Sequence, residues 1–75
     1  MAKSSIQNNI RKLRFHAGEM TQQELADLAR VSRQTIVAIE KGNYSPSLEL
    51  AFRMASIFKT PLDEVFIYKV DVDSP

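Results

Sequence analysis

Hydrophobic residues recur every three or four positions along most of the chain, which is the spacing of helices with one apolar face. Polar and glycine-containing junctions interrupt the pattern, so it predicts five short helices. With their capping residues these helices cover residues 8–17, 21–30, 32–41, 47–58 and 60–66. No apolar run reaches the about 20 residues that span a bilayer, and no membrane segment is expected.

Residues that satisfy free backbone groups mark the predicted helix boundaries. Glu24 comes three residues after a threonine, which is the spacing of a capping box, and Pro61 stands at the first position of the last helix. Gly18 and Gly42 follow two of the helices, where a left-handed backbone commonly ends a helix. The predicted N-caps are Asn8, Thr21, Ser32, Ser47 and Thr60.

The C-terminal end changes from a helical to an alternating pattern. Tyr68, Val70 and Val72 fall on one side of this segment, and Ile67 falls on the other side with charged residues. The alternation of β-branched and polar residues predicts a strand. Its two candidate partners are residues 4–7 of the same chain and a second copy of the protein, and a frayed tail is the alternative.

The chain has 75 residues, which is one domain at most, and a formal net charge of +1. This small value hides a gradient. Residues 1–60 carry nine basic and five acidic side chains, whereas residues 61–75 carry one basic and four acidic side chains. The gradient favours a polyanion at the basic part, although ordinary surface scatter gives the same counts.

The residue inventory argues against catalysis. The chain has no cysteine and a single histidine, His16, so it offers neither a disulfide framework nor a cysteine zinc site. A lone histidine without a nucleophile or metal partner is usually a solvated surface residue. We therefore expect no enzyme, no catalytic residue, no metal and no cofactor. The first residues lack the apolar stretch of a secretory signal, and the expected location is the cytoplasm.

The junction between the second and third helices carries the most specific pattern. The small residue Ala26 stands where two helices must approach closely, and a short turn at residues 29–31 separates the helices. This is the layout of a helix-turn-helix, whose second helix enters the major groove of DNA. The side chains predicted to be buried between the two helices are Leu25, Ala26, Val31, Ile36 and Ile39.

The outward face of the third helix has the chemistry of a base reader. Arg33 can bond to O6 and N7 of guanine, and Gln34 can bond to N6 and N7 of adenine. Val37 and Ala38 are small enough to let the helix seat closely and to touch a thymine methyl. Each of these residues alone is typical of a solvated surface, so the prediction depends on their combination with the capping box and the small residue.

Together these motifs resemble the Xre family, the Cro/CI-type helix-turn-helix repressors. The resemblance covers residues 8–66 and implies an all-α, lambda-repressor-like domain of five helices, with a short terminal β element as in the compact stand-alone members. Residues 1–7 are then an N-terminal arm or short strand, and residues 67–75 are a short strand or tail. The matching segments are NIRKLR (9–14), MTQQELA (20–26), VSRQTI (31–36), IEKG (39–42), PSLELA (46–51) and PLDEVF (61–66).

The resemblance also implies roles for individual residues. Gln22 matches a phosphate contact at the start of the second helix, and Lys41 and Asn43 fall in the loop that touches the DNA backbone. Arg14 and Glu40 match a pair that forms an internal salt bridge between the first and third helices. The residues that fall on base-reading positions are Arg33, Gln34, Val37 and Ala38.

Other expectations come from positions where this sequence departs from the family or adds to it. Arg30 stands where the turn often has glycine, so it is expected to be left-handed and can reach a phosphate. Glu19 is an extra residue that lengthens the first loop. Tyr44 either contacts the DNA backbone or covers the edge of the core. The aromatic residues expected in the core are Phe15, Phe52, Phe58 and Phe66.

The expected partner is a double-stranded DNA operator. We expect a repressor that binds a palindromic operator as a homodimer, with two third helices about 34 Å apart. The alternative is an antitoxin that binds a toxin protein as well as DNA, and a pure protein-interaction module is a third reading. The expected dimer interface combines the fourth and fifth helices with Ile67, Tyr68, Val70 and Val72.

Overall fold

A computed structural model describes residues 6–68 of the chain. This part contains five helices and a two-stranded sheet, which confirms the predicted all-α fold with a short β element. In chain order the elements are β1 (Ile6–Asn8), α1 (Ile10–His16), α2 (Gln22–Ala29), α3 (Arg33–Glu40), α4 (Leu48–Phe58), α5 (Leu62–Val65) and β2 (Phe66–Tyr68). Across residues 6–68, no helix has the length and apolar character that crossing a membrane requires.

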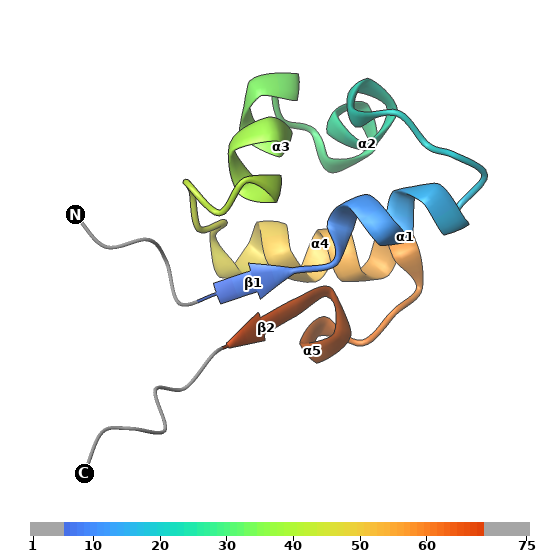
Figure 1. Ribbon diagram of the computed structural model, residues 1–75. Helices are drawn as coiled ribbons and strands as arrows, with labels where there is room; N and C mark the ends of the chain where they lie inside the picture. Colours follow the sequence, from blue (N-terminus) through green and yellow to red (C-terminus); the bar gives the residue numbers. More distant parts are fainter. Residues whose placement is uncertain (1–5, 69–75) are drawn as a thin grey trace, which may run out of the picture.

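The elements are arranged in two ends joined by a long helix. Figure 1 shows α2 and α3 together at one end of the molecule and α5 with β2 at the opposite end. The longest helix, α4, has 11 residues and contacts both α2 and α5. The helix-turn-helix and the sheet are therefore attached to one common scaffold.

Three helices begin at the predicted capping residues. The side chains of Thr21, Ser32 and Ser47 each accept a hydrogen bond from a backbone amide three residues later. Glu24 in turn accepts from the Thr21 N–H at 2.8 Å, which completes the capping box. Because four amides at a helix start have no partner within the helix, these local bonds determine where α2, α3 and α4 begin.

The start of α1 differs from the prediction by one residue. The capping position is Asn9, and its side chain makes no capping bond. Asn8 nevertheless accepts a hydrogen bond from the Ile10 N–H at Oδ1, over 3.1 Å. Asn8 therefore satisfies one free amide of α1 from within strand β1.

The predicted Thr60 cap is wrong, because Thr60 takes part in the end of α4. Lys59 turns left-handed with a φ of 53°, and the Thr60 N–H then donates to the Ala55 carbonyl at 3.0 Å. The Thr60 hydroxyl donates to the Phe58 carbonyl at 2.9 Å. The helical start shifts one residue later, so that Pro61 occupies the capping position of α5.

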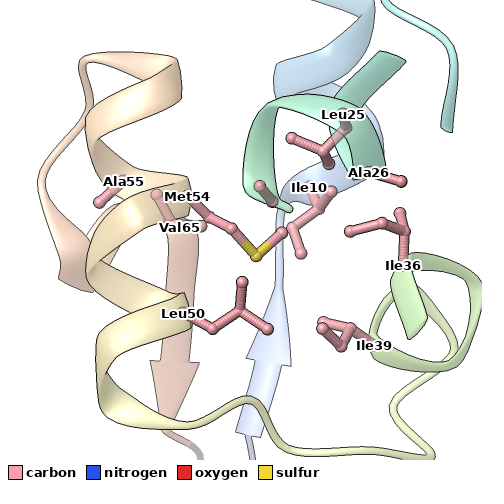
Figure 2. Packing of buried hydrophobic residues seen from close by; sticks show 10 residues of the cluster. Ile10, Leu25, Ala26, Ile36, Ile39, Leu50, Met54, Ala55 and Val65 are labelled. Carbon is pink, nitrogen blue, oxygen red and sulfur yellow. The ribbon is translucent and has the colours of Figure 1, made fainter. Parts of the chain in front are cut away.

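The core lies between α4 and the helix-turn-helix. All the side chains predicted to pack between α2 and α3 are buried, except Val31, which is half-buried. Figure 2 shows Leu50 and Met54 of α4 pointing across the core toward Ile36 and Ile39 of α3. Burial of one such side chain contributes about 1.5–3 kcal/mol, so α4 fixes the inner face of α3.

Two of the four aromatic residues predicted in the core are exposed. Phe15 is 63% exposed and Phe52 is 54% exposed. Each stands two residues from a residue that faces the core, which turns its side chain about 200° around the helix axis. Phe58 and Phe66 are half-buried and pack against the core, as predicted.

The sheet pairs the two ends of the described part. Strands β1 and β2 are antiparallel, with Ile6 opposite Tyr68 and Asn8 opposite Phe66 (Figure 1). The partner of the C-terminal strand is thus the N-terminal segment of the same chain, one of the two candidates. The described strand β2 starts one residue earlier than the alternating pattern predicts. Val70 and Val72 lie outside the described residues.

Candidate nucleic-acid interface

The first turn of α3 presents polar side chains to solvent. Ser32 ends the turn before it and accepts from the Thr35 N–H at 3.2 Å, which fixes the direction in which the helix leaves the turn. Arg33 and Gln34 follow at once, and both are exposed. This places a guanidinium and an amide, two groups able to recognise base edges, at the N-terminal end of one short helix.

One turn further along α3 the side chains are smaller and less exposed. Val37 and Ala38 are half-buried, whereas Lys41, at the capping position after the helix, is exposed. The sequence predicts small side chains beside the polar pair, and the structure puts them on a continuous strip of α3. A strip of this shape allows close approach of a flat or grooved partner.

The turn between α2 and α3 is tight because Arg30 adopts the left-handed conformation, with a φ of 64°. The Val31 N–H then donates to the Ala26 carbonyl at 3.0 Å, which closes α2. Ala26 itself is fully buried, so a larger side chain there would push the helices apart. The predicted left-handed Arg30 is confirmed, and the residue is exposed in the turn before α3.

An ion pair anchors the last turn of α3 to α1. Arg14 Nε donates to Glu40 Oε2 at 2.7 Å, and Arg14 Nη2 donates to Glu40 Oε1 at 3.1 Å. The remaining nitrogen, Nη1, donates to the Met20 carbonyl at 2.8 Å, just before α2. The two side chains are 15% and 10% exposed, so water screens this pair less than a surface pair. Arg14 thereby links α1 to α3 and to the loop that leads into α2.

Gln22 joins the same network. Its Nε2 donates to Glu40 Oε1 at 3.2 Å, so the side chain of the first α2 residue is held against the last turn of α3. The sequence assigned Gln22 to a phosphate, and this contact with Glu40 was not anticipated. The bond still leaves Gln22 at the N-terminus of an eight-residue helix, where free amides and the helix dipole favour an anion.

A hollow of about 390 Å³ opens beside this network. Its rim includes Arg11, which sequence reasoning did not select, together with Lys41; both are exposed. Arg11 stands three residues before Arg14 and so shares its helix face, which is the sequence signal that could have found it. The residues lining the hollow are Arg11, Arg14, Gln22, Val37, Glu40 and Lys41.

The loop after α3 carries the other two residues expected at phosphates. The Asn43 N–H donates to the Ala38 carbonyl at 2.9 Å, which holds the loop against the end of α3. Gly42 allows this turn with a φ of 79°. Tyr44 is 51% exposed, so part of its ring covers the protein and part is available to solvent.

The residues expected at a dimer interface belong to another part of the surface. A groove of about 710 Å³ lies between the start of α4, α5 and the sheet, and Tyr68 lines it. Ile67 is 38% exposed and sits on the opposite face of β2, because successive residues of a strand alternate. The groove residues are Ile6, Pro46, Leu48, Ala51, Leu62, Asp63, Phe66 and Tyr68.

Two short helices, a tight left-handed turn and a capped outer helix with exposed polar residues define the class of this domain as a helix-turn-helix. A helix-turn-helix family model matches residues 10–65, from the first residue of α1 to the last residue of α5. The match covers the complete set of helices, and it includes α4 and α5 as well as the α2–α3 unit.

Similar proteins come from archaea and bacteria. The chain is 48% identical over 62 residues to an uncharacterised HTH-type transcriptional regulator of Methanocaldococcus jannaschii, covering 80% of this chain and 94% of the relative. It is 44% identical over 63 residues to one from Archaeoglobus fulgidus, covering 84% and 89%. It is 39% identical over 61 residues to YgzD of Bacillus subtilis, covering 81% and 91%.

The chain therefore belongs to the Xre family of Cro/CI-type helix-turn-helix proteins, as its motifs predict. It is a DNA-binding regulator and not an enzyme. Among residues 6–68, no group of three or more histidine, aspartate or glutamate side chains is arranged to hold a metal ion.

Proposed function

We propose that α3 enters the major groove of a DNA operator, where Arg33 and Gln34 read base edges. The observation that carries this proposal is the exposure of both side chains on the first turn of a helix that Ser32 caps at its start and that Arg14 holds at its last turn. Val37 and Ala38 allow the helix to seat closely and touch thymine methyl groups. A helix held at both ends keeps these groups aligned before DNA arrives.

The DNA backbone is expected on both sides of α3. Lys41 and Asn43 follow the helix, and Arg30 precedes it, so cationic and amide groups flank the base-reading strip. Gln22 contributes through the free backbone amides at the start of α2, since its side-chain amide already donates to Glu40. Such contacts orient the protein on the duplex and carry no base information themselves.

We propose further that two copies of the chain bind a palindromic operator. One eight-residue helix offers few base contacts, and a two-fold dimer doubles them at half-sites one DNA turn apart. The groove beside the sheet supports the choice of surface, because Leu48 is 69% exposed and Tyr68 is 67% exposed there. Exposed apolar side chains that gather along one groove are typical of an interaction site.

Selection of duplexes from a random library by the full chain, followed by sequencing, tests the DNA-binding proposal. The expected result is an enriched inverted repeat with half-site centres about 10 base pairs apart. Recovery of sequences indistinguishable from the input library would overturn sequence-specific recognition. Single half-sites enriched without a preferred spacing would overturn the palindromic dimer alone.

Repression is the proposed output, because a bound dimer at a promoter excludes the polymerase from the same DNA. In vitro transcription from a promoter that overlaps the selected operator should fall as the protein is added, and a promoter with a scrambled operator serves as the control. An increase in transcription would identify an activator.

The antitoxin alternative predicts a different use of the groove. If the chain sediments as a monomer, the groove is available to bind another protein, as the antitoxin alternative requires.

A further inference from the structure

Asn8 connects the sheet directly to α3. Its Nδ2 donates to the Ile39 carbonyl at 2.9 Å, across 31 residues of sequence. Its backbone belongs to strand β1, which pairs with β2 through Asn8 and Phe66. The same side chain accepts from the Ile10 N–H at Oδ1. One half-buried amide thus bridges the sheet, the start of α1 and the last turn of α3.

The bond reaches α3 at the point where the helix orientation is determined. Ile39 and its neighbour Glu40 belong to the last turn of α3, and the Glu40 side chain is held by Arg14 of α1. The Ile39 carbonyl is one of the last acceptors of the helix and receives Asn8 in addition to the Gly42 N–H. A displacement of the last turn of α3 relative to the sheet would have to lengthen the bond from Asn8 to the Ile39 carbonyl.

We propose that Asn8 is a positioning residue that fixes the angle of α3 relative to the dimer-forming sheet, and thereby the spacing of half-sites that a dimer accepts. This inference rests on the proposed function, since it needs a dimer that uses the sheet and an operator read by α3. A dimer presents its two α3 helices at a distance and twist set by the path from the interface to each helix. Helix α4 supplies one such path through the core, and β2, β1 and the bond from Asn8 to Ile39 supply a second, hydrogen-bonded one.

Asn9 provides a matched control. Its Nδ2 donates to the Glu64 carbonyl at 2.9 Å, so it makes the same type of bond over the same distance. That bond ends on α5 and does not reach α3. Asn8→Asp and Asn9→Asp each remove one amide donor and add one negative charge, so a general effect of charge or folding appears in both variants.

The test measures binding of the full chain to duplexes that carry two copies of the selected half-site, with the spacing varied in single base-pair steps. One step rotates a half-site by about 34° around the DNA axis, so an accurately held α3 discriminates sharply between neighbouring spacings. In Asn8→Asp the preference for the best spacing over its neighbours should fall about fivefold, the factor that one ordinary hydrogen bond represents. Binding to a duplex with one half-site should change equally in Asn8→Asp and Asn9→Asp.

Asn8→Ser covers the case in which Asn8→Asp fails to fold. Serine adds no charge and keeps an oxygen near the Ile10 amide, but it is too short to reach the Ile39 carbonyl. A fall in spacing preference in either folded Asn8 variant, with the preference retained in Asn9→Asp, supports the inference. Wild-type spacing preference in a folded Asn8 variant, or an equal loss in Asn9→Asp, overturns it and leaves the proposed function intact. A wild-type chain that selects no duplex overturns both.

Discussion

The α2–α3 end of the molecule exposes mostly polar side chains over a hydrogen-bonded network, although Leu28 of α2 is 53% exposed, whereas the face made by the start of α4, α5 and the sheet exposes large apolar ones. At the first end, Glu40 accepts hydrogen bonds from Arg14 and Gln22. At the second, Leu48 and Tyr68 are each about two-thirds exposed. In residues 6–68, every fully buried side-chain nitrogen and oxygen has a hydrogen-bond partner.

The two surfaces also differ in the length and capping of the elements that form them. Helices α2 and α3 have eight residues each and carry side-chain caps. On the other surface only α4 is long and capped, because α5 has four residues without a side-chain cap and each strand has three. Short elements such as these depend on tertiary contacts, and an isolated two-stranded sheet is marginal in water. The difference means that α5 and the sheet depend more on packing against the rest of the chain than α2 and α3 do.

The largest expected effect comes from removing the acceptor of the polar network. Glu40→Ala leaves the guanidinium of Arg14 and the amide of Gln22 without their shared partner, and we expect a loss of about 3 kcal/mol in the free energy of unfolding. Urea denaturation followed by circular dichroism measures this loss. The double variant Arg14→Met/Glu40→Leu should recover most of the stability while half-site binding stays weak. Recovery of binding together with stability would contradict an orienting role for the network.

The second prediction concerns the apolar face. Leu48→Glu puts a charge into the proposed dimer interface, and we expect the dimer dissociation constant to rise about 100-fold. Sedimentation equilibrium measures the change. Ser56→Glu adds the same charge at an exposed position of the same helix outside the groove, and it should leave the dimer intact. Equal dissociation in both variants would move the interface away from the groove.

The third prediction tests base reading at α3. Arg33→Lys keeps the charge but loses the paired donors of the guanidinium, so discrimination at one base pair of each half-site should fall by about 2 kcal/mol. Gln34→Ala should relax a different base pair. Binding to single-substitution operators measures both effects. A variant that loses the same affinity for all operators would show that the residue contacts phosphate.

The fourth prediction concerns the basic rim of the hollow beside the network. Arg11→Ala should weaken binding to all sequences alike and reduce the slope of log K against log salt by about 0.9, the contribution of one phosphate. Titrations at several salt concentrations give the slope. Lys12→Ala removes a neighbouring exposed cation that does not line the hollow. An equal change of slope in both variants would mean that the hollow has no special role.

The smallest effect is expected at the left-handed caps. Arg30→Gly and Lys59→Gly each relieve a residue with positive φ, and each should stabilise the protein by up to about 1 kcal/mol. Thermal unfolding measures both. Only Arg30→Gly should also weaken DNA binding, because Arg30 lies in the turn before α3. Unchanged binding in this variant would remove Arg30 from the phosphate contacts.

Most of the helical framework could be read from the sequence, because the signals that define it are local. Thr21, Ser32 and Ser47 cap the amides of the next turn through their own side chains, and Arg30 turns left-handed with short-range bonds alone. The polar first turn of α3 follows from the same signals, since the cap at Ser32 fixes which residues come next. The pairing of Arg14 with Glu40 was implied by the resemblance of the motifs to the Xre family, and the structure contains it.

The tertiary structure decided what depends on groups far apart in sequence. Phe15 and Phe52 were predicted in the core because they are aromatic. In the structure other residues of α1 and α4 face the core, and the two aromatic side chains lie on the exposed faces of these helices. The pairing of β1 with β2 joins residues about 60 positions apart, and the bond from Asn8 to Ile39 joins residues 31 positions apart. Neither contact can be inferred from the residues of one helix or strand. Local hydrogen bonds are encoded within one helical turn, whereas burial and long-range bonds exist only after the elements have packed.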